Sequence, residues 1–208
     1  MYLSKLTLNP SPACRQVLRD LANPYEMHRT ILRAYPGRED GGPGRVLFRL
    51  EPPTPGQPPV VLVQSDKPPK WDALDAVSDY LLSAEAKEFT PSLTVGRRLR
   101  FRLHANPTVK RDGKRHGLPD DQAQQDWLLR KGRAGGFRPL DFTVRRSTKL
   151  TSRRSSDNGP TREIHLAVDY EGILEVTDAG AFAKALAAGI GPAKGYGFGL
   201  LSVAPLRD

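Results

Sequence analysis

The stretch GIGPAKGYGFGLLSVAP, residues 189–205, joins a glycine-rich loop to the last predicted strand, and five glycines fall within its first eleven residues. Glycine is used where the backbone takes a positive φ or where another group approaches closely. Pro192 stiffens the middle of the loop. The apolar run from Leu200 to Val203 predicts the strand. The stretch therefore indicates a defined loop that leads into the edge of a β-sheet.

This loop carries one charge, on Lys194, which is followed by Gly195 and Gly197. Backbone N–H groups and one ammonium group can together hold a phosphate, so these three residues are candidates for phosphate contact. The spacing is not that of a P-loop, and no Ser or Thr follows Lys194. A glycine-rich turn that only connects two elements explains the same residues.

The rest of the chain predicts two runs of the same order of elements. The first run comprises strands at 2–8, 46–50 and 60–64, helical segments at 12–35 and 71–81, and a short segment at 89–93. The second comprises strands at 99–103, 142–144 and 164–168, helices at 119–132 and 178–187, and the strand after the glycine loop. We therefore expect an α+β fold of two tandem ferredoxin-like βαββαβ domains, residues 1–94 and 95–208.

Positive charge is concentrated in the middle of the chain. The 208 residues carry a net charge of +9, but residues 97–154 hold 17 basic and 5 acidic side chains, whereas residues 1–96 hold 11 of each. A local field of this sign favours a polyanionic partner. A solvated basic face with no ligand is the alternative.

Other classes of protein are disfavoured by what the sequence lacks. No apolar run approaches the ~20 residues that cross a bilayer, and the N-terminus lacks a signal-peptide core. Cys14 is the single cysteine, which allows neither an intramolecular disulfide nor a thiolate metal site. No Cys, His or carboxylate cluster has metal-ligand spacing. We expect a cytoplasmic protein without membrane association, metal or cofactor.

Asn23-Pro24 predicts the start of a helix that carries a pair of candidate catalytic side chains. Asn23 suits the N-cap, Pro24 suits the first helical position, and Glu26 completes a capping-box pattern. Tyr25 and His28 are three residues apart and share a helix face. A histidine beside a tyrosine can act as a general base with an orienting hydroxyl. A partly buried structural histidine is the alternative.

Three segments resemble the CasE family, the repeat-RNA-processing endoribonucleases of type I-E CRISPR systems. They are NPYEMHR at 23–29, LRFRLHANP at 99–107 and the stretch at 189–205, and the similarity runs over essentially the whole chain. The resemblance implies tandem RRM-like domains. It also implies metal-free cleavage of CRISPR repeat RNA at the base of a stem-loop and retention of the mature crRNA among the other Cascade subunits. A monomer is expected outside that complex.

The resemblance also implies roles for individual residues. The family's catalytic histidine aligns with His28 and its tyrosine with Tyr25. The closest counterparts of the family's basic loop are Arg145, Arg146 and Lys149, and of these Lys149 is the candidate for the cation near the phosphate. The 2′-OH of the RNA would be the nucleophile, giving 2′,3′-cyclic phosphate and 5′-OH ends. The candidates for RNA contact are Arg100, Arg102, Lys114, Arg115, Arg130, Lys131, Arg145, Arg146, Lys194, Gly195 and Gly197. A non-catalytic subunit that binds structured RNA would explain the charge and the fold equally well.

Overall fold

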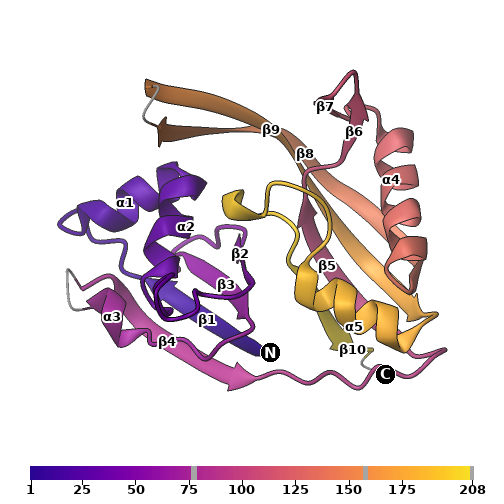
Figure 1. The fold of residues 1–208 in the computed structure, drawn as a ribbon, viewed down its shortest axis with the longest axis horizontal. Helices are drawn as coiled ribbons and strands as arrows, with labels where there is room; N and C mark the ends of the chain where they lie inside the picture. The colour runs from indigo at the N-terminus through magenta and orange to yellow at the C-terminus, as the bar shows by residue number, and fades with distance from the viewer. Residues whose placement is uncertain (76–78, 157–158, 207–208) are drawn as a thin grey trace. The chain divides into compact units, whose positions relative to one another are not determined.

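Residues 1–75, 79–156 and 159–206 are described by the computed structural model shown in Figure 1. The first run of elements is β1 (Tyr2–Leu8), α1 (Arg15–Ala22), α2 (Pro24–Leu32), β2 (Val46–Leu50), β3 (Val60–Ser65), α3 (Asp72–Asp75) and β4 (Leu81–Glu88). The second run is β5 (Arg98–Ala105), β6 (Thr108–Arg111), β7 (Lys114–Gly117), α4 (Asp121–Ala134), β8 (Phe137–Ser156), β9 (Gly159–Val176), α5 (Ala179–Ala188), a 3₁₀ turn (Lys194–Tyr196) and β10 (Leu201–Pro205).

The chain forms two compact units that are not continuous in sequence. The first unit consists of Met1–Thr90, Ser152–Glu163 and Gly195–Gly197. The second unit consists of Pro91–Thr151, Ile164–Lys194 and Phe198–Asp208. One short piece of the glycine-rich loop therefore belongs to the first unit. The predicted domain limits, 1–94 and 95–208, stay a prediction.

The sheet of the first unit has the strand order β2-β3-β1-β4, with antiparallel pairing. Because α1 and α2 connect β1 to β2, and α3 connects β3 to β4, the arrangement is ferredoxin-like. In β1 the buried residues Leu6 and Leu8 alternate with Thr7 and the exposed Lys5, as predicted. Leu6 belongs to one apolar cluster with Ile31 of α2 and Phe48 of β2. Burial of this face holds α2 on the sheet.

The predicted helix from Trp71 to Leu81 is wrong. The helix there is the short α3, and β4 begins at Leu81 and pairs with β1; Val77 lies outside the described residues. The apolar spacing reflects separate contacts with the core, because Trp71 Nε1 donates to Ser4 Oγ at 3.1 Å and the Tyr80 hydroxyl donates to Asp20. β4 has little β-propensity of its own, so pairing with β1 determines its structure.

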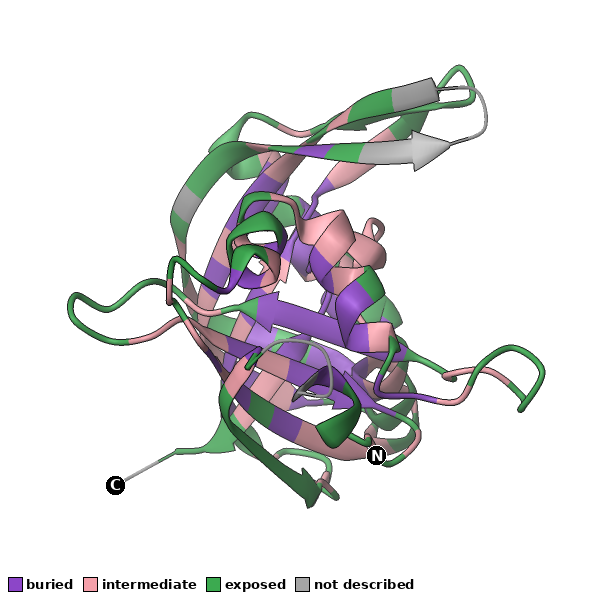
Figure 2. Ribbon diagram, turned by 90° about the vertical axis from the view of Figure 1, so that its left-hand side faces the viewer, coloured by how far each residue is buried: buried purple, intermediate pink, exposed green. Residues whose placement is uncertain are grey.

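The second unit repeats the topology. Its sheet has the order β10-β5-β9-β8, with α4 between β5 and β8 and α5 between β9 and β10. The period-2 pattern of β5 is confirmed, since Leu99, Phe101 and Leu103 are buried while Arg100 is exposed. Figure 2 shows many buried residues in strands, whereas the connecting loops are largely exposed. The tandem ferredoxin-like fold expected from the sequence is thus the observed fold.

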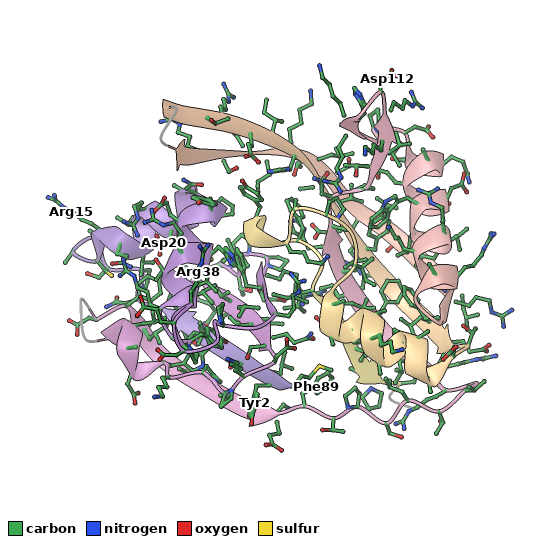
Figure 3. All side chains as sticks on the ribbon, in the orientation of Figure 1. Tyr2, Arg15, Asp20, Arg38, Phe89 and Asp112 are labelled. Carbon is green, nitrogen blue, oxygen red and sulfur yellow. The ribbon has the colours of Figure 1, made fainter. Side chains whose placement is uncertain are left out.

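The basic segment at 110–115 is a β-hairpin. β6 and β7 pair in antiparallel register, and Asp112, labelled in Figure 3, lies at the turn. Asp112 and Gly113 have φ values of 48° and 78°. An Asp-Gly pair with two positive φ angles is the usual two-residue hairpin turn, so the sequence contained the signal. The hairpin presents Lys114 and Arg115 as exposed side chains.

Among the helices of the described residues, none is long and apolar enough to cross a membrane.

Gly172 of β9 should be indispensable to the second sheet. A Cβ at this position would overlap the carbonyl oxygen of Asp141 and lie 2.6 Å from Phe142 Cα. We expect Gly172→Ala to lower the free energy of unfolding by about 1–3 kcal/mol, as overpacking does, measured by urea denaturation. Gly180→Ala is the control, because the nearest atom to its Cβ would be Asp178 Oδ1 at 3.5 Å. Equal midpoints for the two variants would contradict the expectation.

Candidate active site

Asn23 begins α2 and so determines where Tyr25 and His28 lie. Its backbone is extended, with φ −142° and ψ 100°, and its side chain accepts a hydrogen bond from the Tyr25 N–H at 3.3 Å. Pro24 takes the first helical position, as predicted. The capping box is incomplete, because Glu26 pairs with Arg29 at 3.3 Å and the Asn23 N–H donates to the Asp20 carbonyl.

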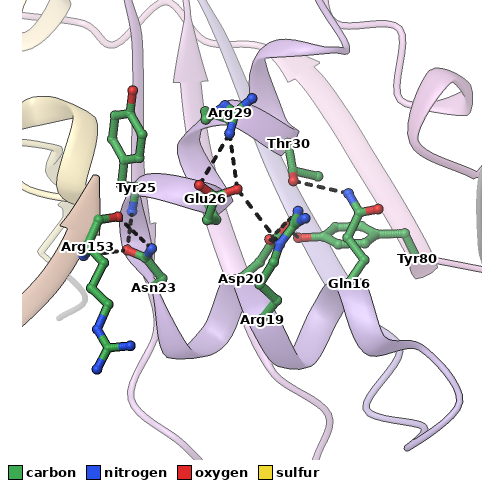
Figure 4. A network of polar contacts seen from close by, with 10 residues as sticks. All are labelled: Gln16, Arg19, Asp20, Asn23, Tyr25, Glu26, Arg29, Thr30, Tyr80 and Arg153. Carbon is green, nitrogen blue, oxygen red and sulfur yellow. Dashed lines mark hydrogen bonds and ion pairs between the residues drawn. The ribbon is translucent and has the colours of Figure 1, made fainter. Parts of the chain in front are cut away.

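The same Asn23 side chain contacts the backbone of β8 (Figure 4). Asn23 Nδ2 donates to the Arg153 carbonyl at 2.8 Å, and the Arg153 N–H donates to Asn23 Oδ1 at 3.4 Å. Arg153 belongs to the segment of β8 that is part of the first unit. In Figure 4 its exposed side chain points away from the Tyr25 hydroxyl. The backbone of a basic strand is therefore held at the N-terminus of α2.

A buried carboxylate fixes the turn between α1 and α2. Asp20, 1% exposed, accepts hydrogen bonds from Arg19 Nε at 3.0 Å, from Arg19 Nη2 at 2.9 Å and from the Tyr80 hydroxyl at 3.0 Å. A buried charge requires such partners. Burial, with the negative charge of Asp20, raises the pKa of Tyr80. This group orders the chain entering α2 (Figure 4).

His28 is partly buried against an aromatic ring. Its imidazole stacks on Phe48, with ring centroids 5.9 Å apart and an interplanar angle of 14°. Nδ1 is buried, and among the described residues it has no hydrogen-bond partner. Burial lowers the pKa of His28 below its ordinary value of 6.5. The ring is therefore mainly neutral at pH 7, and Nε2 is the nitrogen left to meet a ligand.

The 195–197 segment of the glycine-rich loop packs on the side chains of Tyr25, His28 and Phe48. The Tyr196 ring lies 5.8 Å from the Tyr25 ring, at 30°. A Cβ on Gly195 would lie 3.3 Å from His28 Cδ2, and one on Gly197, whose φ is +85°, would lie 3.2 Å from Phe48 Cε2. The sequence predicts these glycines at a phosphate, and it gives no prediction of a role for Tyr196 or Phe48 at this site. The sequence did contain a signal for Tyr196, which lies between two glycines in the stretch at 189–205 that resembles the CasE family.

Several candidate RNA contacts already have intramolecular partners. Arg102 and Arg145 share Glu171, with N–O distances of 3.5 and 3.1 Å. Lys194 Nζ donates to the Gly191 carbonyl at 2.9 Å. Lys131 Nζ lies 5.7 Å from the centre of the Trp127 ring. These contacts compete with a phosphate for the same cations.

The remaining basic candidates are exposed. They are Arg100, Lys114, Arg115, Arg130 and Lys149, whereas the side chain of Arg146 lies outside the described part of the structure. Lys149 lies on the part of β8 that belongs to the second unit, while His28 belongs to the first. The role of Lys149 at the cleaved phosphate therefore stays a prediction. Within residues 1–75, 79–156 and 159–206, no three His, Cys, Asp or Glu side chains are placed to hold a metal ion.

Comparisons with known proteins identify relatives along the whole chain. A family model described as CRISPR associated protein matches residues 1–205. The CRISPR-associated endoribonuclease Cse3 of Thermus thermophilus is 44% identical over 216 residues, covering 99% of this chain and 100% of that protein. The CRISPR system Cascade subunit CasE of Escherichia coli is 33% identical over 220 residues, with the same coverage.

Solved structures of these relatives have the same fold. Thermus thermophilus Cse3 bound to an RNA representing a pre-cleavage complex superposes with a TM-score of 0.87 at 43% identity, covering 98% of both chains. The CRISPR-associated protein Cas6e of Escherichia coli superposes with a TM-score of 0.71 at 29% identity, covering 99% of this chain and 100% of that one. The similarities in sequence and in fold each cover nearly the whole chain, and the chain belongs to the CRISPR-associated protein family that the model describes.

Proposed function

We propose that this protein is a metal-independent endoribonuclease that cleaves CRISPR repeat RNA at the base of a stem-loop and keeps the mature crRNA. The observation that carries the proposal is the neutral, partly buried His28 beside Tyr25 on α2. The endoribonuclease name and the pre-cleavage RNA complex of the Thermus relative support the reaction class. A subunit that only binds RNA has no use for an imidazole held in its basic form.

The proposed reaction is a transesterification within the RNA. His28 Nε2 removes the proton of the 2′-OH, and the 2′-oxygen attacks the adjacent phosphorus. A bond from the 2′-oxygen to phosphorus forms, and the bond from phosphorus to the 5′-oxygen breaks. A proton delivered to the 5′-oxygen leaves a 5′-OH and a 2′,3′-cyclic phosphate. The Tyr25 hydroxyl, two residues after the helix cap, would orient the phosphate or the leaving oxygen.

The negative charge on the phosphate requires a nearby cation, and we assign this cation to a side chain of β8. Side chains two residues apart lie on one face of a strand, so Arg145, Lys149 and Arg153 share a face. All three are exposed. Lys149 is the proposed cation for the transition state, and the backbone of the same strand contacts Asn23 at Arg153.

RNA binding is assigned mainly to the β6–β7 hairpin and α4. A-form RNA is recognised by shape and phosphate contacts, which suits the exposed Lys114 and Arg115 on the hairpin and Arg130 on α4. The partner proteins are the other subunits of a Cascade complex, in keeping with the name of the Escherichia coli relative. A monomer outside the complex and a cytoplasmic location belong to the same proposal, and the free Cys14 suits a reducing compartment.

Cleavage of a repeat hairpin should persist in EDTA, because the nucleophile comes from the RNA and the base from His28. The products should carry 2′,3′-cyclic phosphate and 5′-OH ends, mapped by end-labelling and phosphatase sensitivity. Activity that is lost on chelation and restored by a divalent ion would contradict the proposed mechanism.

His28→Ala should reduce the single-turnover rate by about 10²–10⁴, the usual contribution of a general acid or base. Affinity for the hairpin should hardly change, since phosphate contacts dominate it. A 2′-deoxy nucleotide at the cut should block the wild-type protein in the same way. His116→Ala removes an exposed imidazole from β7 and should cut at the wild-type rate with saturating RNA. If His28→Ala cut at the wild-type rate, another residue would have to be the general base.

The salt dependence of RNA binding should show whether the β6–β7 hairpin contacts the RNA. Replacing both Lys114 and Arg115 by Ala should reduce the slope of log K against log[salt] by about 1.4–1.8 if each contacts one phosphate. The variant Arg38→Ala/Lys87→Ala removes the same charge from exposed positions outside the candidate set. Its slope should match that of the wild type. Equal slopes for the two double variants would place the β6–β7 hairpin away from the RNA.

A further inference from the structure

Phe48 is the surface on which the His28 ring lies. It stands in the middle of β2, is 1% exposed, and pairs in register with the fully buried Val63 of β3. Its ring and the imidazole are 5.9 Å apart and nearly parallel, at 14°. Because a strand and an apolar core fix Phe48, its ring offers His28 a stationary face.

The glycine-rich loop contacts the same two rings. Gly195 approaches His28 so closely that a Cβ would lie 3.3 Å from Cδ2 and 3.6 Å from Nε2. Gly197 approaches Phe48, where a Cβ would lie 3.2 Å from Cε2. All four residues belong to the first compact unit. The imidazole thus has an aromatic face on one side and bare backbone beside its Nε2 edge.

Hydrogen bonding does not explain the orientation of this ring. A catalytic histidine is usually oriented by a partner on its second nitrogen. His28 Nδ1 is buried and, among the described residues, has none. Another histidine of the chain does have such a partner, since His104 Nδ1 lies 2.6 Å from Asp169 Oδ1. Packing is therefore what remains to set the plane of the His28 ring.

We propose that Phe48 is the positioning residue of His28, and that it acts together with the backbone of Gly195. Stacking on Phe48 restricts rotation of the imidazole about its Cβ–Cγ bond, and contact with Gly195 limits how far the Nε2 edge can move. The two contacts hold Nε2 in one direction without a hydrogen bond to Nδ1. The catalytic consequence rests on the proposed function, whereas the contact itself does not.

The first test uses the RNA-free protein and does not depend on cleavage. The chain has four histidines, so the imidazole signals can be followed individually by NMR and His28 identified with His28→Ala. We expect the wild-type His28 to titrate below 6.5. In Phe48→Leu its titration should move toward 6.5, because a freer ring meets more water. Phe182→Leu is the matched control, since Phe182 is fully buried in the second unit and packs on Phe137.

The second test separates chemistry from binding. Phe48→Leu should lower the single-turnover rate about 10- to 100-fold, the scale of a small misplacement of a catalytic group. Affinity for a 2′-deoxy hairpin that cannot be cut should stay within twofold of wild type. Phe182→Leu should cost stability but change neither the rate at saturating RNA nor the titration of His28.

Gly195→Ala tests the other contact if Phe48→Leu fails to fold. Gly195 does not have a positive φ, so alanine suits its backbone and the added Cβ acts mainly on His28. The rate should fall about tenfold or more with affinity kept, whereas Gly37→Ala, whose Cβ would have only Asp40 Oδ2 within 4 Å, at 3.9 Å, should leave the rate unchanged.

Wild-type titration and wild-type rate in either folded variant would overturn the proposal. A wild-type protein that never cuts the hairpin would instead refute the proposed function, and the NMR titration would still decide the contact.

Discussion

One side-chain amide determines the geometry of the candidate site. Asn23 accepts from the Tyr25 N–H and the Arg153 N–H, and it donates to the Arg153 carbonyl. Aspartate or serine would cap α2 equally well. Aspartate has no N–H with which to meet the carbonyl, so its cap would leave that group without a donor. The choice of Asn among good capping residues is explained by the second contact, which joins the start of α2 to β8.

Cations on the second sheet are less available to RNA than their number suggests. Glu171 pairs with Arg102 and Arg145, and Glu175 pairs with Arg98 and Arg138 at 3.8 and 2.9 Å. Exposed ion pairs of this kind contribute little to stability, but each carboxylate cancels part of the local field. The β6–β7 hairpin holds five basic or histidine side chains against one acidic residue at its turn. The electrostatic attraction for a polyanion is therefore greater at the hairpin than at the Arg–Glu pairs of the sheet.

The sequence predicted those features of the fold and the site that depend on residues close together in the chain. The Asn23-Pro24 start of α2, the Tyr25 and His28 pair and the alternation of β5 all follow from caps and periodicity. β4 could not be found in this way, because its Ala- and Glu-rich sequence becomes a strand only by pairing with β1. Phe48 was also out of reach, and only the position of Tyr196 between two glycines pointed to that residue. Their contacts with His28 and Tyr25 join residues far apart in the chain, and the resemblance that identified His28 said nothing about its packing.

The discontinuity of the first unit has a consequence during synthesis. Domains generally fold as their residues leave the ribosome, the N-terminal part first. A nascent chain that has emerged as far as β4 contains α2 and its sheet, but it lacks both the β8 segment that contacts Asn23 and the turn at Gly195–Gly197. His28 is consequently enclosed only when almost the whole polypeptide is available. An incomplete translation product would display the histidine on α2 without the loop backbone that contacts it in the complete fold. Under the proposed function, such a product would not cut RNA.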